Sequence, residues 1–416
     1  MKKWIIHGNK QLSGNVKIEG AKNSLVAILP AAILTKSIVE LENVTPISDT
    51  YVLIDILKKL NVEVIYDNES KMIIDARFVK NARLISEDMR KLRASYYFMG
   101  ALLGLYKKVS IIGPGGCKFS SRPIDLHLKA FKQLGVVYKY NDEVYVLEKK
   151  EVGEKSVVFE KVSVGATINA ILASCRRKGT TIITNVAMEP EIDDLIEFLN
   201  KSGADIIRKD NKIIVKGKVN LHGCKHKIIQ DRIEAGTFLV LGACVGKSLT
   251  IDYTEPEKLN SLINVLKNCG VPIIVEKGGI KVSSVETLND SDLICDVYPG
   301  LPTDLQQPLS ILLSKTRKKS SLKDNVYPSR YTQIDDLNVM GFNMQVENGA
   351  LSVYRSESIC GKQVFCKDLR GGASLILAGL LASGETVISN VYHIERGYYN
   401  LLNKLRKIGA IAYEED

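Results

Sequence analysis

Long hydrophobic runs are missing from this sequence. No apolar stretch reaches the roughly 18 residues that a membrane-spanning helix needs, although 45% of the 416 residues are hydrophobic. Residues 1–8 turn polar too early for a secretory signal peptide. We therefore expect a cytoplasmic protein that does not contact a membrane.

Paired-cysteine and cofactor motifs are also missing. The eight cysteines include no Cys-x-x-Cys pair, and several lie in apolar segments, which is typical of reduced structural thiols. Residues 222–226 read His-Gly-Cys-Lys-His, but a fourth ligand is missing nearby, so a metal site there is disfavoured. No Gly-x-Gly-x-x-Gly joins a strand to a helix, and residues 242–248 fall one residue short of a phosphate loop. The sequence predicts neither a metal nor a dinucleotide cofactor.

Aromatic residues are scarce, whereas positive charge is in excess. Only 6% of residues are aromatic and no nucleic-acid-binding motif occurs, yet the net charge is +10. Such a charge suits nucleic acid, a membrane surface or a small anion. The basic runs at residues 176–178 and 315–319 fall at predicted helix ends, where we expect them to face solvent. A small anionic substrate is therefore favoured over nucleic acid.

One pattern recurs six times along the chain. Each copy holds an apolar helix rich in small residues, a strand, an amphipathic helix and a further strand. The amphipathic helices end at positions 67 to 74 residues apart, namely Asn61, Gly135, Gly203, Gly270, Gly341 and Gly409. Glycine there is typical of a left-handed helix cap. The repeat predicts an α/β protein of six units, each of about 70 residues, with three units in each of two domains.

The first helix of each copy is apolar on nearly all sides, which predicts a buried helix. These helices span residues 24–34, 94–105, 166–175, 235–245, 305–313 and 373–381, and Pro30 is expected to kink the first. Polar residues precede each helix, and helix N-termini attract anions. With nearby cations they predict a trap for phosphate and carboxylate groups, formed by Lys22, Arg93, Arg122, Arg330, Arg370 and Arg396. The alternative is a set of separate caps and surface charges.

The loop at residues 113–127 combines glycines with a thiol and two cations. Cys117 is followed by Lys118, and Arg122 comes shortly after. Glycine lets the backbone approach a ligand closely, and nearby cations favour a thiolate or a bound anion. The loop is typical of a moving segment that carries a reactive side chain, although an ordinary turn with a buried cysteine would have the same composition.

Motifs along essentially the whole chain occur in the order and spacing of one enzyme family. They are GNVKIEGAKNS (14–24), LRAS (92–95), PGGC (114–117), RPIDLH (122–127), KVSVGAT (161–167), DRIEAGT (231–237), PGLPTDLQ (299–306), DLRGGA (368–373) and YHIERGY (392–398). In these segments the chain resembles the UDP-N-acetylglucosamine 1-carboxyvinyltransferases. These enolpyruvyl transferases catalyse the committed step of peptidoglycan synthesis, on which cell-wall biogenesis, cell shape and cell division depend.

This resemblance implies a fold and a domain division. The family fold is a two-domain inside-out α/β barrel with three repeated units per domain and the active site in the cleft between the domains. The N-terminal strand completes the C-terminal domain, so we expect residues 21–228 to form one lobe and residues 1–20 with 229–416 the other. The loop that carries Cys117 is expected to close over the substrates. A monomer is expected.

The reaction implied by the resemblance adds the 3-hydroxyl of UDP-N-acetylglucosamine to C2 of phosphoenolpyruvate and then expels phosphate. It uses no metal or organic cofactor. Cys117 matches the family's proton donor, which fosfomycin alkylates, and Asp304 matches the acceptor of the hydroxyl proton. Lys22 and Arg396 complete the matched catalytic set. The positions that match phosphoenolpyruvate ligands, with neighbours added by residue type, are Lys22, Asn23, Arg122, Arg330, Arg370 and Arg396.

The nucleotide-sugar site is likewise implied by matching positions. They are Asn23, Arg93, Arg122, Pro123, Ile124, Asp125, Leu126, Lys161, Val162, Ser163, Val164, Asp304 and Val326. Asp368 matches a carboxylate that the family uses near the reacting centre.

The chain also departs from the family pattern. Lys118 to Ser121 replace small uncharged residues, Gln230 replaces a proline, Pro328 replaces a glutamate, and residues 43–48 lack a frequent lysine. These departures keep two alternatives open. One is a diverged enzyme that transfers enolpyruvyl to another nucleotide or sugar, and the other is a catalytically silent protein that binds nucleotide sugars and regulates the pathway.

Overall fold

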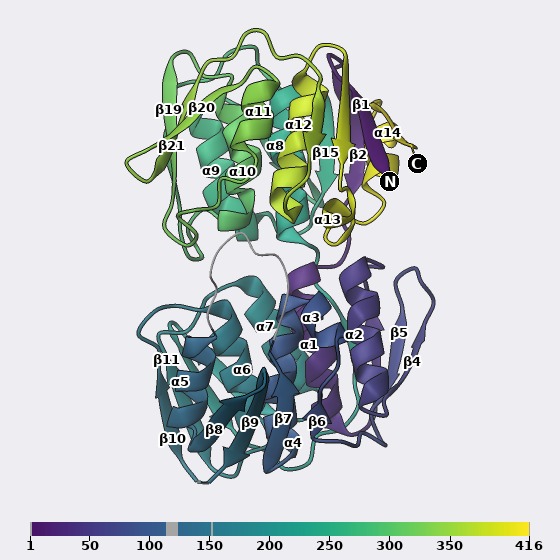
Figure 1. The fold of residues 1–416 in the computed structure, drawn as a ribbon, viewed down its shortest axis with the longest axis vertical. Coiled ribbons are helices and arrows are strands. Elements are labelled where there is room, and N and C mark those ends of the chain that lie inside the picture. The colour runs from purple at the N-terminus through teal and green to yellow at the C-terminus, as the bar shows by residue number, and fades with distance from the viewer. Residues whose placement is uncertain (1, 114–123, 151–152, 416) are drawn as a thin grey trace. The chain divides into compact units, whose positions relative to one another are not determined.

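The chain divides into two compact units (Figure 1). The computed structural model describes residues 2–113, 124–150 and 153–415. Unit 1 consists of Met1–Glu19 and Gln230–Asp416, and unit 2 consists of Gly20–Ile229. Three predicted site residues, Cys117, Arg122 and Pro123, lie outside the described residues.

Unit 2 contains three four-stranded sheets built to one plan. In each sheet, the strand that follows a buried helix pairs in parallel with an edge strand and antiparallel with a hairpin. The spatial orders are β14 (Lys225–Lys227), β3 (Ile38–Glu42), β5 (Met72–Asp75), β4 (Glu63–Tyr66); β6 (Arg83–Leu84), β7 (Lys108–Ile112), β9 (Val144–Lys149), β8 (Val136–Asn141); and β10 (Lys155–Val158), β11 (Thr180–Thr184), β13 (Lys212–Lys216), β12 (Asp205–Lys209). Thr181 and Ile183 of β11 are buried and Ile182 between them is exposed, so this sheet covers the core with one face.

Unit 1 repeats this plan in three further sheets. The spatial orders are β2 (Leu12–Lys17), β15 (Gly246–Asp252), β17 (Gly279–Val282), β16 (Ile273–Glu276); β18 (Asp292–Cys295), β19 (Lys319–Asp324), β21 (Ala350–Tyr354), β20 (Asn343–Glu347); and β22 (Gln363–Phe365), β23 (Glu385–Ser389), β1 (Lys3–His7), β24 (Ile411–Glu415). The predicted sixfold repeat is therefore confirmed, with three sheets in each unit.

The N-terminal strand completes the last sheet, as the resemblance implied. Strand β1 lies antiparallel between β23 and β24, with Trp4 opposite Ile388 on one side and Glu414 on the other. Figure 1 shows this strand in purple beside the yellow C-terminal segment of the same unit. The sixth repeat thus borrows a strand from the other end of the chain.

The first repeat of unit 2 and the first repeat of unit 1 exchange their parallel edge strands, β14 and β2. Strand β2 precedes the first helix of unit 2 in sequence but pairs in parallel with β15 of unit 1. Strand β14 comes just before the segment Gln230–Asp416 of unit 1, but it pairs in parallel with β3 of unit 2. The chain consequently passes from one unit to the other twice.

The six predicted buried helices are present. In unit 2 they are α1 (Lys22–Ala32) followed by the 3-10 turn η1 (Ile33–Thr35), α4 (Tyr97–Leu105) preceded by η2 (Arg93–Tyr96), and α6 (Val164–Ser174). In unit 1 they are α8 (Arg232–Val245), α10 (Gln306–Leu313) preceded by η4 (Thr303–Leu305), and α12 (Leu369–Leu381). Pro30 does not end the first helix, which continues to Ala32 before tightening into η1.

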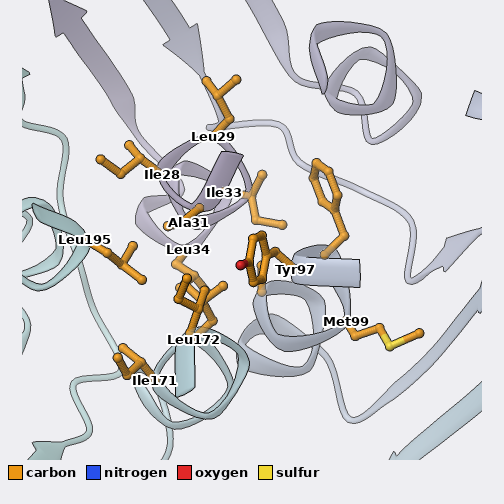
Figure 2. Close-up of a cluster of buried hydrophobic side chains, with 14 of the residues drawn as sticks. Ile28, Leu29, Ala31, Ile33, Leu34, Tyr97, Met99, Ile171, Leu172 and Leu195 are labelled. Atoms are coloured by element: carbon orange, nitrogen blue, oxygen red, sulfur yellow. The ribbon is translucent and has the colours of Figure 1, made fainter. Parts of the chain in front are cut away.

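Small residues let these helices approach each other closely. Figure 2 shows Ile28, Leu34, Tyr97, Ile171, Leu172 and other apolar side chains from α1, α4, α6 and their neighbours meeting in one cluster. A Cβ atom at Gly104 would lie 2.5 Å from Leu34 and 2.9 Å from the Leu172 carbonyl oxygen. The alanine-rich and glycine-rich composition of the helices is therefore a packing requirement.

Amphipathic helices cover the outside of each repeat. They are α2 (Ser48–Lys59), α5 (Asp125–Gln133), α7 (Pro190–Lys201), α9 (Asn260–Asn268), α11 (Ile334–Val339) and α14 (Leu401–Lys407), and the shorter helices are α3 (Asp88–Lys91), η3 (Pro256–Leu259) and α13 (Tyr392–Glu395). The predicted cap residue after each amphipathic helix has positive φ, from +62° at Asn61 to +100° at Gly341. The predicted left-handed caps are confirmed in all six repeats.

The basic runs face solvent only in part, and for three of their cations the prediction was wrong. Arg177 is 8% exposed and donates to the carbonyl oxygens of Leu134 at 2.8 Å and Gly153 at 3.1 Å. Arg176 donates to the Leu34 carbonyl at 2.7 Å, and Lys315 to the Cys244 carbonyl at 2.7 Å. These three cations satisfy carbonyl groups, most of them near the C-termini of neighbouring helices, where the helix dipole favours positive charge.

The cysteines that the structure describes are free thiols, as the sequence predicted. Five of them are buried. Burial raises the pKa of both Cys175 and Cys244 to about 12, so these two thiols are unreactive at neutral pH. Among the described residues, no helix is long and apolar enough to cross a membrane.

Candidate active site

In unit 1 a carboxylate lies between two arginines at the start of the buried helix α10. Asp304 lies in η4, just before α10, and its Oδ1 accepts from Arg330 at 2.7 Å. Its Oδ2 accepts from Arg370, in the first turn of α12, at 3.0 Å. Arg330 and Arg370 are 4% and 3% exposed, whereas 25% of the Asp304 side chain is accessible. The structure thus brings together three of the predicted site residues.

The two guanidinium groups control the ionisation of this carboxylate. Burial would raise the pKa of Asp304, but the charges of Arg370 and Arg330 outweigh it and hold the pKa far below the ordinary value. The carboxylate is therefore ionised at neutral pH, and it is a weak base while both arginines remain in place.

Two hydroxyl groups in sequence, those of Tyr398 and Thr237, support the other side of the Arg370 guanidinium. Its second terminal nitrogen donates to the Tyr398 hydroxyl at 2.9 Å, and that hydroxyl lies 2.9 Å from Thr237 Oγ1 on α8. Burial raises the pKa of the Tyr398 hydroxyl, which therefore stays protonated. Neither Tyr398 nor Thr237 was among the predicted site residues, although both belong to motifs that carry the family resemblance.

Asp368 is used as a helix cap. Its Oδ1 accepts from the backbone amides of Arg370 and Gly371, both at 3.0 Å, and its Oδ2 accepts from Thr332 and from Gln307. Asp231 caps α8 in the same way. At α8 and α12 a carboxylate of the chain therefore accepts from two first-turn amides, which leaves fewer amides for an external anion than the sequence suggested.

Two further predicted residues of unit 1 are Arg396 and Val326. Arg396 is half-buried at the C-terminal end of α13. Burial, and after it the charge of Arg396, lower the pKa of His393, while Asp368 acts in the opposite direction. Arg396 and Asp368 therefore act on the same imidazole. Val326 lies in a turn after β19, where its amide donates to Asp324 at 2.9 Å.

In unit 2, Lys22 opens helix α1 and pairs with a carboxylate that sequence reasoning missed. Its Nζ lies 2.7 Å from Asp49 Oδ2, and Asp49 is 1% exposed in the first turn of α2. Asn23 follows Lys22 in the first turn of α1 and is half-buried. The ion pair fixes the direction in which Lys22 extends from the helix.

A second cluster in unit 2 links three segments predicted to bind the nucleotide sugar. The guanidinium of Arg93 lies 5.9 Å from the Tyr96 ring, and the Tyr96 ring lies 4.5 Å from the ring of His127 on α5. Asn169 on α6 donates to His127 Nδ1 at 2.8 Å. Burial, followed by the charge of Arg93, lowers the pKa of His127 to about 3, so this imidazole is neutral at physiological pH.

These contacts hold η2, α5 and α6 against one another. A Cβ atom at Gly165 would lie 2.7 Å from the Tyr96 hydroxyl and 2.8 Å from His127. Ser163 caps α6 by accepting from the Ala166 amide at 3.3 Å. The predicted residues Ile124, Asp125 and Leu126 lie at the start of α5, and Lys161, Val162, Ser163 and Val164 lie at the start of α6. Tyr96, His127 and Asn169, which connect them, were not predicted.

The two histidines of the segment 222–226, where a metal site was disfavoured, contact other groups of the protein. His226 Nε2 lies 2.8 Å from Asp194 Oδ1, with both side chains fully buried, and His222 contacts the Gly223 carbonyl at 3.0 Å. In the part of the chain that the structure describes, no group of three or more His, Cys, Asp or Glu residues could hold a metal ion.

Two of the departures from the family pattern have structural explanations in unit 1. Gln230 donates to the Asp252 carbonyl at 2.8 Å and accepts from the Thr254 amide at 3.0 Å, so it joins the chain to the end of β15. Pro328 lies in an exposed turn in which the Arg330 amide donates to the Tyr327 carbonyl at 3.1 Å. Neither residue is among the hydrogen-bond partners of Asp304, which are Arg330 and Arg370.

Comparisons with known proteins agree with these motifs. Residues 6–405 match the family model of EPSP synthase (3-phosphoshikimate 1-carboxyvinyltransferase). UDP-N-acetylglucosamine 1-carboxyvinyltransferase 2 of Listeria monocytogenes is 45% identical over 98% of this chain and 96% of its own length. The protein of the same name from Bacillus cereus is 40% identical over 100% of this chain and 97% of its own length.

Solved structures share the fold at lower identity. The crystal structure of the enolpyruvyl transferase NikO from Streptomyces tendae aligns with a TM-score of 0.89 and 23% identity, over 99% of this chain and 98% of that one. EPSP synthase from Acinetobacter baumannii aligns with a TM-score of 0.75 and 16% identity, over 100% of both chains. The expected fold class is confirmed.

Proposed function

The chain belongs to the EPSP synthase family of enolpyruvyl transferases, and we propose that it transfers the enolpyruvyl group of phosphoenolpyruvate to the 3-hydroxyl of UDP-N-acetylglucosamine. Full-length relatives at 40% and 45% identity carry the name of this activity. The observation that carries the proposal is the Asp304 cluster, where a carboxylate and two arginines meet at the start of a buried helix. The product is made at the committed step of peptidoglycan synthesis, in the cytoplasm, by a monomer.

The reaction needs a base, an acid and ligands for a phosphate dianion. The hydroxyl oxygen of the sugar adds to C2 of phosphoenolpyruvate, its proton passes to a base, and C3 receives a proton from an acid. Loss of phosphate from the tetrahedral intermediate, with removal of a proton from C3, then gives the enol ether. We assign the base to Asp304 and the acid to Cys117, with Lys22 and Arg396 at the reacting groups.

The Asp304 cluster supplies a reason for the base to act only when substrate is bound. In the described arrangement Arg330 and Arg370 donate to Asp304 and depress its pKa. A phosphate or carboxylate group of phosphoenolpyruvate competes for the same guanidinium donors, which suit oxyanions geometrically. As the donors turn toward the substrate, Asp304 becomes more basic and can take the hydroxyl proton.

The two units take different parts of this reaction. We propose that residues 21–228 and residues 1–20 with 229–416 act as the two lobes of the enzyme. Unit 1 provides Asp304, Arg330, Arg370, Arg396, Asp368 and Val326. Unit 2 provides Lys22, Asn23, Arg93, Arg122, Pro123, Ile124, Asp125, Leu126, Lys161, Val162, Ser163 and Val164 as ligands of phosphoenolpyruvate and the nucleotide sugar, together with Cys117. Neither a metal nor an organic cofactor is required by this chemistry.

The test is release of inorganic phosphate from phosphoenolpyruvate with three acceptors tried separately. We expect release with UDP-N-acetylglucosamine and none with UMP or shikimate 3-phosphate. Release with another acceptor alone would favour the diverged enzyme. Binding of UDP-N-acetylglucosamine without phosphate release would favour the silent regulator and contradict the proposal.

A further inference from the structure

A directed chain of hydrogen bonds runs through unit 1 from helix α8 to Asp304. The Thr237 hydroxyl donates to the Ile233 carbonyl at 2.8 Å, which uses its only proton. The Tyr398 hydroxyl, 2.9 Å from Thr237 Oγ1, must therefore donate to it. The oxygen of Tyr398 is then left to accept from Arg370 at 2.9 Å. Every hydroxyl in the chain consequently points in one direction.

Burial makes this arrangement rigid. Thr237, Tyr398 and Arg370 are 5%, 2% and 3% exposed. The guanidinium carbon of Arg370 lies 5.3 Å from the centre of the Tyr398 ring, so ring and hydroxyl both restrain it. With one terminal nitrogen on Tyr398, the other is directed at Asp304 Oδ2, 3.0 Å away.

The second arginine of the cluster is held differently. One terminal nitrogen of Arg330 is shared between Asp304 Oδ1 at 2.7 Å and two oxygens of Thr303, each at 3.4 Å. Arg330 also stands in a turn, whereas Arg370 stands in the first turn of a buried 13-residue helix. The Thr303 hydroxyl near Arg330 donates to Asp324, whereas the hydroxyl that accepts from Arg370 donates to a second hydroxyl, that of Thr237.

We propose that Tyr398 is a positioning residue for the transfer reaction, whose hydroxyl keeps the Arg370 guanidinium oriented toward Asp304 and toward the incoming phosphate. The inference rests on the proposed function and deepens it. Tyr398 does not itself touch the reacting atoms; it acts through Arg370. Thr237 contributes by fixing the direction of the Tyr398 hydroxyl.

A double-mutant cycle tests whether Tyr398 acts through Arg370. Tyr398→Phe keeps the ring and removes the hydroxyl, and we expect kcat/KM for phosphoenolpyruvate to fall about tenfold, since a hydrogen bond to a charged group is lost. Arg370→Ala removes the group being positioned and is expected to cost more. In the Arg370→Ala background the tyrosine change should have no further effect, because its partner is already absent.

Variants of Thr237, with Tyr106→Phe as a control for Tyr398→Phe, distinguish an effect on the orientation of Arg370 from a loss of stability. Thr237→Val should lower kcat/KM about threefold through misdirection of the Tyr398 hydroxyl, and Thr237→Ser should restore it. Tyr106→Phe is the control, because the Tyr106 hydroxyl donates to the Val79 carbonyl at 3.3 Å in unit 2 and is outside the proposed machinery. It removes a similar hydrogen bond and should leave kcat/KM unchanged.

The outcomes distinguish this inference from the proposed function. Equal effects of Tyr398→Phe in the wild-type and Arg370→Ala backgrounds would show that Tyr398 supports the fold only, and would overturn the inference. If Arg370→Ala does not fold, Arg370→Met, which keeps a long side chain and has no donor, takes its place in the same cycle. If the wild-type protein does not convert phosphoenolpyruvate and UDP-N-acetylglucosamine, the proposed function fails. The double-mutant cycle is then measured on the Kd for inorganic phosphate, determined by calorimetry. The same coupling is expected there, and additive effects would again overturn the inference.

Discussion

The two units are built on one plan but differ at the starts of their buried helices. In unit 1, α8 and α12 are capped by Asp231 and Asp368, and Asp304 precedes α10. In unit 2 the corresponding helices begin with Lys22, with Arg93 and after the neutral cap Ser163. Unit 1 thus has a carboxylate at each of these three helix starts, beside Arg232 at α8 and Arg370 at α12, whereas the starts in unit 2 carry two cations and a hydroxyl without a carboxylate.

In the proposed function, unit 1 supplies the base, and unit 2 supplies the acid and most ligands of the two substrates. The carboxylates of unit 1 satisfy helix amides and hold arginines, which gives a dense set of paired charges suited to moving protons. The positive helix ends of unit 2 keep cationic side chains, which suits a nucleotide diphosphate. Substitutions at matched places in the two units therefore test whether the units differ in function.

The largest effect is expected from Cys117, the acid that we assign to unit 2. Cys117→Ala should lower kcat by about 10²- to 10⁴-fold, the usual contribution of a general acid. Cys117→Asp should retain turnover and resist alkylation by fosfomycin, because a carboxylic acid replaces the thiol. Phosphate release and mass spectrometry after fosfomycin treatment measure both. Cys360→Ala, which removes an exposed thiol of unit 1, is the control, and full activity of Cys117→Ala would remove the acid role.

The equivalent test in unit 1 is Asp304→Asn, which preserves size and removes charge. We expect kcat to fall about 10²- to 10³-fold, since the base is lost, and the Tm to fall, since Arg330 and Arg370 then face each other without a carboxylate. The Asp304 carboxylate, with its depressed pKa, stabilises the fold above its unfolded pKa of about 3.9, and this contribution is lost as the pH falls toward the folded value.

Asp335→Asn is the matched control, because the Asp335 side chain is 94% exposed in the same unit. Unchanged kcat in Asp304→Asn would mean that another group takes the hydroxyl proton.

A pair of arginine variants should separate the two substrates. Arg396→Ala in unit 1 should raise KM for phosphoenolpyruvate, and Arg93→Ala in unit 2 should raise KM for UDP-N-acetylglucosamine, each by about ten- to a hundredfold. Steady-state kinetics with each substrate varied in turn gives both constants. If both variants affected the same substrate, the assignment of Arg93 or of Arg396 would be wrong.

The neutral His127 of unit 2 predicts a pH effect on stability. Its pKa is lowered to about 3 in the folded chain and is about 6.5 when unfolded. The unfolded chain therefore binds a proton that the folded chain does not, and stability falls as the pH drops below 6.5. Between pH 7 and pH 5 the loss from this group is about 2 kcal/mol. Urea denaturation of His127→Gln should show a weaker pH dependence, whereas His222→Gln should match the wild type.

The smallest effect is expected at the repeated helix caps. Gly409 in unit 1 has φ of +98°, and a Cβ atom added there would meet no other atom within 4 Å, so Gly409→Ala adds backbone strain alone. We expect a loss of about 1 kcal/mol in the free energy of unfolding. Asn61 in unit 2 already adopts φ of +62° and donates to the Phe78 carbonyl at 2.9 Å. Asn61→Gly should change stability by less than Gly409→Ala does, as measured by denaturant unfolding.

Local sequence signals predicted much of the fold. The glycine and asparagine caps require a backbone conformation that few residues adopt, so their spacing alone indicates the six repeats. The apolar helices could be recognised because their burial is nearly complete on all sides. The partners of the basic runs could not be predicted locally, because groups such as the Leu34 carbonyl, 142 residues from Arg176, are remote in sequence.

The residue types of the candidate site were likewise set by the sequence, which supplied Asp304, Arg330, Arg370, Lys22 and Arg93. Tertiary structure alone decided how they are paired. It placed Arg370 between Asp304 and Tyr398, set Asp49 beside Lys22, and joined Arg93 to His127 through Tyr96. Thr237 and Tyr398 are 161 residues apart. Such pairings depend on which helix ends the sheets bring together, and no local pattern of residues encodes the distance between two side chains on different repeats.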